Sequence, residues 1–152
     1  EGLAEQARPF LDVDGMALLQ RRLAQDRRLA LASADVHVAV DADGWAGPVL
    51  ELRVRRGDDP ARGLRLLCRQ RSPGGSGRLR LRALAPDGTV ADELGVDGNG
   101  LFDVRLPFGP AAAGTREVYR VCAEGGFVPA RCEPGSEDRR TLTFLVEAVL
   151  PL

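Results

Sequence analysis

Several residue types are missing or rare in this chain of 152 residues. It contains no lysine and no isoleucine, and its single asparagine is Asn99. This bias looks like the coding bias of a GC-rich genome, in which arginine is the default cation. Arginine in place of lysine is therefore not by itself a sign of bidentate phosphate recognition.

Residues for metal and nucleophile chemistry are also scarce. His37 is the only histidine, and with Cys68, Cys122 and Cys132 it gives four Cys/His residues, none in a C-x-x-C pair. A zinc site needs about four such ligands, or three and a water, so we exclude zinc. No G-x-S-x-G surrounds any serine, and a hydrolase that uses His37 as its base is the least favoured function.

No apolar run of about 18 residues is present, which excludes a membrane-spanning helix. The chain starts at Glu1 without a basic segment and an apolar run, so a signal peptide is absent or already removed. The abrupt start suggests a piece cut from a longer chain, or a processed one.

The three cysteines are expected to differ in their surroundings. Alternation with Leu64 and Leu66 points Cys68 inward, as a buried free thiol. Cys122 and Cys132 flank a Gly/Pro-rich loop, across which they could pair in an oxidising compartment. The compartment therefore stays open between the cytoplasm and a secreted or cell-surface location.

Alternation of apolar and charged residues is the strongest pattern in the chain. Val49–Ala83 contains VLELRVRR, GLRLLCRQR and GRLRLRALA. A period of two is typical of a strand with one face on a core and one in water. The same pattern predicts strands at about 34–40, 48–56, 63–71, 78–85, 89–95, 102–106, 116–123 and 141–149.

These eight strands are separated by turn signals at short spacing, which predicts a mainly β fold, an antiparallel β-sandwich.

A helix is expected at about 13–28, where Met16, Leu19 and Leu23 recur at helical spacing. We thus expect a lead-in and helix over 1–33 and one sandwich domain over 34–152. The predicted core contains Leu52, Leu66, Leu81, Phe102, Val104, Val121 and Phe144.

Three loop motifs are better explained by turns than by ligands. Asp97-x-Asn99 with Asp103 lacks the glutamate that a calcium loop needs at its twelfth position. A turn likewise explains the motif Asp41-Ala42-Asp43-Gly44 better than a calcium site does. Gly74-Gly75-Ser76-Gly77 lacks the lysine and the following helix of a phosphate loop.

Charge is unevenly distributed along the chain, although the formal net charge is −1. Between Glu51 and Arg82 there are ten arginines and three acids. Alternation gives these strands an arginine-bearing outer face, which is the candidate interaction face. Its members are Arg53, Arg55, Arg65, Arg69, Arg78, Arg80 and Arg82. The alternatives are a solvated face, a face for an acidic protein, and, least favoured because exposed aromatics are few, a nucleic-acid site.

The segment LAPDGTVADELGVDGNGLFDVRLPFGP, over residues 84–110, resembles the carboxypeptidase-regulatory-like (transthyretin-like) sandwich. The pattern D-x-x-G-x-F-x-V-x-L-P-x-G is matched by Asp97, Gly100, Phe102, Val104, Leu106, Pro107 and Gly109, with Tyr119 further on. The resemblance implies a non-catalytic accessory domain and carries over no catalytic residue.

The sequence therefore favours a non-catalytic interaction or scaffold module of a larger bacterial protein, with no cofactor and no metal. Its partner would be an acidic protein or a neighbouring domain of the same polypeptide. The alternative is a carbohydrate- or polyanion-binding domain, in which Trp45 and Tyr119 would share an exposed groove.

Overall fold

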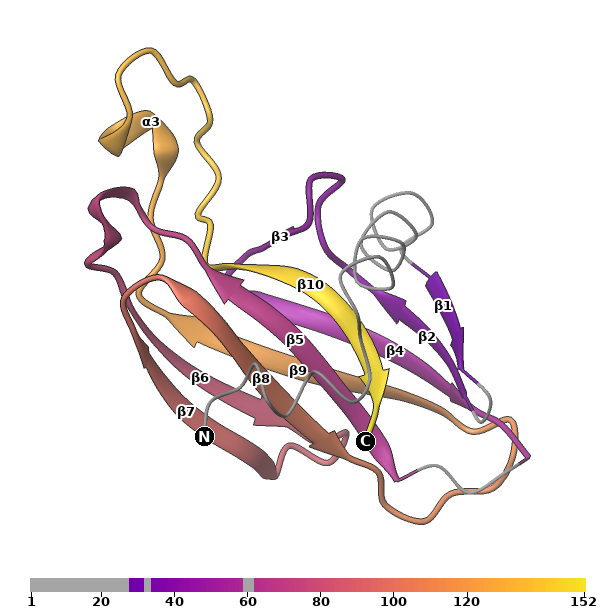
Figure 1. The fold of residues 1–152 in the computed structure, drawn as a ribbon. Helices are drawn as coiled ribbons and strands as arrows, with labels where there is room; N and C mark the ends of the chain where they lie inside the picture. Colours follow the sequence, from indigo (N-terminus) through magenta and orange to yellow (C-terminus); the bar gives the residue numbers. More distant parts are fainter. Residues whose placement is uncertain (1–27, 32–33, 59–61) are drawn as a thin grey trace.

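The computed structural model describes residues 28–31, 34–58 and 62–152, and this part of the protein is almost entirely β. Ten strands form two antiparallel sheets of six and four strands there. In Figure 1 the sheets lie in two layers, with β10 and β5 nearer the viewer than β4 and β9. The described helical elements are a 3-10 turn over Pro73–Gly75 and the four-residue α3, Pro129–Cys132.

The six-stranded sheet has the order β1-β2-β4-β9-β6-β7. Its strands are β1 (Arg28–Leu31), β2 (Ala34–Val38), β4 (Val49–Arg56), β6 (Arg78–Leu84), β7 (Val90–Asp97) and β9 (Arg116–Glu124). The pairs β1–β2 and β6–β7 are hairpins of consecutive strands, whereas β9 pairs with both β4 and β6. The late strand β9 thus joins two earlier parts of the sheet.

The four-stranded sheet has the order β3-β10-β5-β8. Its strands are β3 (Trp45–Ala46), β5 (Gly63–Gln70), β8 (Gly100–Pro107) and β10 (Phe144–Pro151). A bulge in β10 leaves Glu147 without a register partner, because Val146 lies opposite Cys68 and Ala148 opposite Leu67. The extra residue shifts the phase of β10, so that Phe144, Val146 and Val149 enter the core whereas Ala148 and Leu150 do not.

One hydrophobic core fills the space between the two sheets. Phe102 of β8 packs edge-to-face on Phe144 of β10, with ring centroids 5.7 Å apart. The burial prediction is confirmed for all seven core residues, whose exposure is at most 7% in Leu52, Leu66, Leu81, Phe102, Val104, Val121 and Phe144.

Two tight turns flank β7. The first closes the β6–β7 hairpin, whereas the turn at Asp97–Gly100, which the sequence predicts as a hairpin turn, leads from β7 into β8 of the other sheet. Gly88 follows β6 with φ 87°, and Gly98 follows β7 with φ 75°. These left-handed backbone angles favour glycine, which lacks a Cβ. Asn99 also joins two turns, since its Oδ1 accepts the backbone N–H of Ser72 at 2.8 Å. The Gly74–Gly77 segment is therefore part of a turn that ends β5 and begins β6.

Two short strands were not predicted, and the predicted helix is not confirmed. β3 has only two residues, too few to show alternation, and β1 begins at Arg28. The helix expected at about 13–28 lies outside the described residues, apart from Arg28, which belongs to β1. Because β1 pairs with β2, the six-stranded sheet begins before the boundary drawn at residue 34.

Candidate interaction face

Five of the seven candidate arginines lie on one surface, the outer face of the six-stranded sheet. Arg53 and Arg55 project from β4, and Arg78, Arg80 and Arg82 project from β6. In both strands exposed arginines alternate with buried apolar residues. β4 and β6 are not neighbours, because β9 lies between them.

β9 adds two arginines that the candidate set did not contain. Arg116 and Arg120 are exposed on the outer side of β9, while Tyr119 and Val121 point into the core. The alternation in REVYRVCAE predicts this strand, but not its position between the two arginine-bearing strands. From here on, the arginine face means the outward arginines of β4, β9 and β6: Arg53, Arg55, Arg78, Arg80, Arg82, Arg116 and Arg120.

Arg65 and Arg69 are not brought together with the others, because β5 belongs to the four-stranded sheet. The Arg65 Nε donates to Asp103 Oδ2 at 2.9 Å, and Arg65 is only 6% exposed. The Arg69 Nε donates to Glu147 Oε1 at 2.7 Å. The bulge at Glu147 places this carboxylate beside β5. Both arginines are therefore committed to ion pairs within their own sheet.

Carboxylates are interspersed on the arginine face, and some of its arginines are paired. Arg53 and Arg120 lie 3.8 and 3.4 Å from oxygens of Glu51, and Arg78 lies 3.5 Å from Asp97. Such exposed pairs contribute little to stability. The outward acids of this sheet are Asp35, Glu51, Glu93, Asp97 and Glu124.

Four arginines of the face make no ion pair with a described residue: Arg55, Arg80, Arg82 and Arg116. Arg55 and Arg116 lie directly opposite each other on β4 and β9. Like charges in this position are destabilising. Arg80 and Arg82 follow each other on the same side of β6, about 7 Å apart. Three of the four still lie opposite an acid of a neighbouring strand, Arg55 opposite Asp35, Arg80 opposite Glu124 and Arg82 opposite Glu93. With seven outward arginines and five outward acids, the face has a small excess of positive charge.

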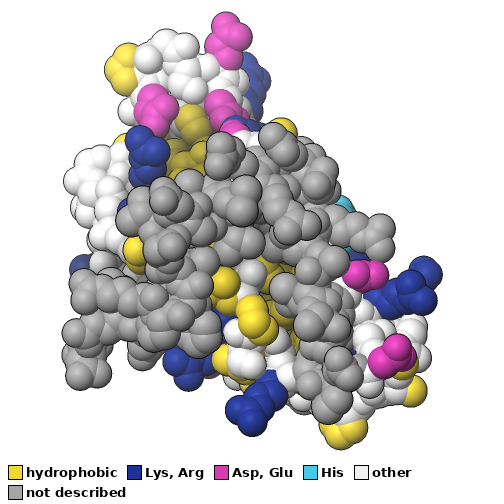
Figure 2. All heavy atoms as spheres, turned by 45° about the vertical axis from the view of Figure 1, so that its right-hand side comes forward, with side chains coloured by type: hydrophobic (Ala, Val, Ile, Leu, Met, Phe, Trp, Pro, Cys, Tyr) yellow, Lys and Arg dark blue, Asp and Glu magenta, His cyan; other side chains and the backbone are white. Residues whose placement is uncertain are grey.

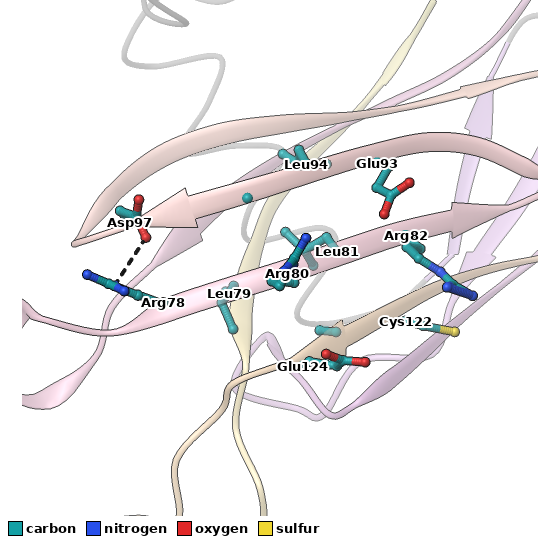
Figure 3. A pocket seen from close by; sticks show the side chains of 12 residues that line it. Arg78, Leu79, Arg80, Leu81, Arg82, Glu93, Leu94, Asp97, Cys122 and Glu124 are labelled. Carbon is teal, nitrogen blue, oxygen red and sulfur yellow. Dashed lines mark ion pairs between the residues drawn. The ribbon is translucent and has the colours of Figure 1, made fainter.

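A shallow depression of about 770 Å³ lies on the outer side of β6, β7 and β9 (Figure 3). Arg78, Arg80 and Arg82 line it together with Glu93, Asp97, Cys122 and Glu124. Gly95 lies opposite Arg80 in the register and carries no side chain to fill the space. The depression is thus bordered by guanidinium and carboxylate groups.

A second depression, of about 560 Å³, lies over β2, β4 and β9. Arg53, Arg55 and Arg116 line it with Asp35 and His37, and His37 lies opposite Arg53 in the register. Its described lining contains no serine, threonine or cysteine. The surroundings of His37 therefore supply no hydroxyl or thiol for a nucleophilic mechanism from that part of the chain.

The two aromatics of the carbohydrate alternative do not share an exposed groove. Tyr119 is 1% exposed and stacks at a tilt on Phe108, with ring centroids 5.4 Å apart. Trp45 packs edge-to-face on Phe127 near the other sheet. A sugar platform made of these two rings is therefore not formed.

Arg140 holds the aspartates of the Asp41–Gly44 turn. Its guanidinium donates to Asp41, Asp43 and Asp138 at 2.9, 2.8 and 2.6 Å. Hydrogen bonds from Arg140 lower the pKa of Asp43 and of Asp138. Within the described ranges, no group of three or more His, Cys, Asp or Glu residues could hold a metal ion. This cluster therefore fastens the 125–143 loop to the turn between β2 and β3.

All three cysteines are free thiols. Cys68 is fully buried, and this burial raises the pKa of its thiol well above the usual value. Cys122 lines the depression on the arginine face, whereas Cys132 is exposed in α3. The burial of Cys68 is confirmed, whereas the pairing of Cys122 with Cys132 on oxidation stays a prediction.

Comparisons with protein-family models and with curated proteins found no match to this chain. None of the described helices is long and apolar enough to span a bilayer. The residues of the arginine face and their surroundings are therefore the basis of the proposed function.

Proposed function

We propose that this chain is a non-catalytic interaction module of a larger bacterial protein that binds an acidic protein partner, or an acidic neighbouring domain of the same polypeptide. The binding surface is the arginine face. The observation that carries the proposal is the set of four exposed arginines without an ion pair among the described residues, Arg55, Arg80, Arg82 and Arg116.

The spacing of these arginines fits an extended acidic segment. Arg80 and Arg82 project from alternate positions of one strand, about 7 Å apart. An extended peptide with carboxylates at alternate positions has the same repeat. Electrostatic attraction of this kind raises the association rate more than the final affinity and weakens with salt.

Two other ligand classes receive less support from this surface. Proteins that bind single-stranded nucleic acid add exposed aromatic rings for base stacking. The described residues that line the two depressions include no aromatic. A free sulfated polysaccharide shares the anionic chemistry of an acidic protein, and the experiment below separates the two.

The resemblance over residues 84–110 supports the accessory-domain part of the proposal. In this segment Phe102, Val104 and Leu106 are buried on β8, as a motif that contributes to a sandwich core requires. An Ig-like or transthyretin-like topology is the arrangement that we propose for the two sheets.

The proposal is tested with a defined probe and matched variants. The probe is a fluorescent peptide with glutamate at alternate positions, and its binding is measured at low and raised salt. The test variant carries Arg80→Ser, Arg82→Ser and Arg116→Ser. The control variant carries Arg105→Ser, Arg131→Ser and Arg139→Ser, which removes the same charge from exposed positions outside the arginine face.

We expect salt-sensitive binding that is lost in the test variant and kept in the control, with unchanged thermal unfolding in both. Equal loss in both variants would mean that only net charge matters, and would reject a specific face. Stronger binding of a heparin oligosaccharide than of the peptide would favour the polyanion alternative instead.

A further inference from the structure

The outer face of the four-stranded sheet carries buried apolar side chains beside paired ions. On β5 and β10 the side chains of Leu67, Ala148 and Leu150 alternate with those that enter the core. They are 0%, 0% and 5% exposed, although the core between the sheets does not include them. Side chains this inaccessible need atoms packed against them on the outer side as well.

The ions on this outer face are arranged as pairs within the sheet. Arg65 pairs with Asp103 of β8, and Arg69 pairs with Glu147 of β10. The exposed fractions of the Arg65 and Glu147 side chains are only 7% and 10%. Pairing of this kind offsets the cost of removing the charges from water. The buried side chains of Leu67, Ala148 and Leu150 therefore require apolar groups in the cover of this face.

No labelled strand or helix lies over β5 and β10 on this side in Figure 1, where α3 lies beyond one end of the sheets. In Figure 2 hydrophobic side chains are visible in the middle of the view, with arginines and acids toward its margins. The cover of this face is therefore not one of the ten described strands.

We propose that residues 1–27 of the same chain dock on the outer face of the four-stranded sheet. This segment leads directly into β1 at Arg28 and is long enough to reach the face. Its apolar residues Met16, Leu19 and Leu23 recur at the spacing of one helical side. A helix over residues 13–27 would be about 22 Å long, close to the roughly 26 Å of an eight-residue strand. The proposal is independent of the arginine face.

Photo-crosslinking in the full chain tests which molecule covers the face. A benzophenone amino acid replaces Leu101 or Arg105, which lie on the outer side of β8 on either side of Asp103. A matched control carries it at Val118 on the outer side of β9, a half-buried position like Leu101. Crosslinked peptides are then mapped by mass spectrometry.

We expect crosslinks within one molecule between either β8 position and residues 1–27, and none from Val118. Crosslinked dimers would assign the face to a second copy and overturn the proposal. Crosslinks confined to the described strands, or equal yields from Val118, would overturn it too.

A second pair of full-chain variants tests the apolar nature of the contact. Leu19→Asp with Leu23→Asp should raise the fluorescence of a hydrophobic dye several-fold and increase hydrogen exchange in β5 and β10. Gln20→Asp with Gln25→Asp adds the same charge at polar positions and should leave both readings unchanged. Equal changes in the two variants would contradict docking through the apolar side of this segment.

Discussion

The carboxylate of Asp92 accepts a hydrogen bond from the backbone N–H of Arg105, with 3.0 Å between Oδ2 and N. Asp92 lies on β7 and Arg105 on β8, which are edge strands of different sheets. The register of β7 skips Ala91, because Ala83 lies opposite Asp92 and Leu84 lies opposite Val90. The side chain of Asp92, next to a β-bulge, thus hydrogen-bonds a backbone amide on the edge of β8. Because this amide is already paired, the edge is less able to add a strand from another molecule.

Asp92→Ala is expected to free this amide. The free energy of unfolding should fall by about 1 kcal/mol, the net value of one hydrogen bond. The variant should also associate at high concentration, as measured by sedimentation velocity. Asp97→Ala is the control, because it removes an acid from the same strand at a position exposed to water. Identical sedimentation of the two variants would contradict the protective role of Asp92.

Phe102→Ala is expected to lower the free energy of unfolding by about 3–5 kcal/mol, because it opens a cavity beside Phe144. Val90 is 50% exposed, so Val90→Ala should change stability by about 0.5 kcal/mol or less. Denaturant unfolding measures both. A midpoint for Phe102→Ala equal to that of the wild type would mean that Phe102 does not pack in the core.

Tyr119 is the only tyrosine, so its phenolate absorbance reports a single group. Burial raises the pKa of Tyr119 to about 12, and the nearby Glu117 adds to the shift. The folded state therefore favours the neutral phenol. Its contribution to stability should be complete below pH about 10, the unfolded pKa, and should be lost as the pH rises toward 12.

A spectrophotometric titration of the folded protein should have its midpoint near pH 12, moving to about 10 in denaturant. Tyr119→Phe should abolish the loss of stability between these two pH values. A folded-state midpoint near 10 would show that the phenol is accessible to water.

Thiol alkylation under native conditions should separate the three cysteines. Cys132 is exposed and should react first, followed by Cys122, whereas Cys68 is fully buried. Burial and the nearby Asp103 and Glu147 raise the pKa of Cys68, which disfavours its reactive thiolate. Mass spectrometry after native and denaturing labelling gives the order. Labelling of native Cys68 as fast as Cys132 would refute its burial.

Strand positions were predictable because alternation and turn residues are local signals. VLELRVRR and RLRLRAL each show which residues are buried without any knowledge of the partner strand. The partner strands were not predictable in this way. Arg65 and Arg53 occur in similar local patterns, but β5 and β4 belong to different sheets. The sequence therefore predicted an outward face made of arginines, but not which of these arginines lie together on one sheet.

Long-range pairing also explains what the sequence did not reveal about β9 and β10. Arg116 lies beside Arg55 only because β9 enters next to β4. Glu147 reaches Arg69 only because a bulge shifts the register of β10. Neither relationship produces a periodic pattern in the sequence, so neither could be predicted from the sequence alone.

The central position of β9 has a consequence for the order of folding during synthesis. Leu52 pairs with Tyr119, which is synthesised 67 residues later. Until β9 has been synthesised, β4 and β6 therefore each have one unpaired edge. Pairing over such sequence distances slows folding. During this interval we expect the arginines of β4 and β6 to repel the equivalent strands of other nascent chains. The charges that form the arginine face would then also oppose aggregation of an incomplete sheet before its middle strand is translated.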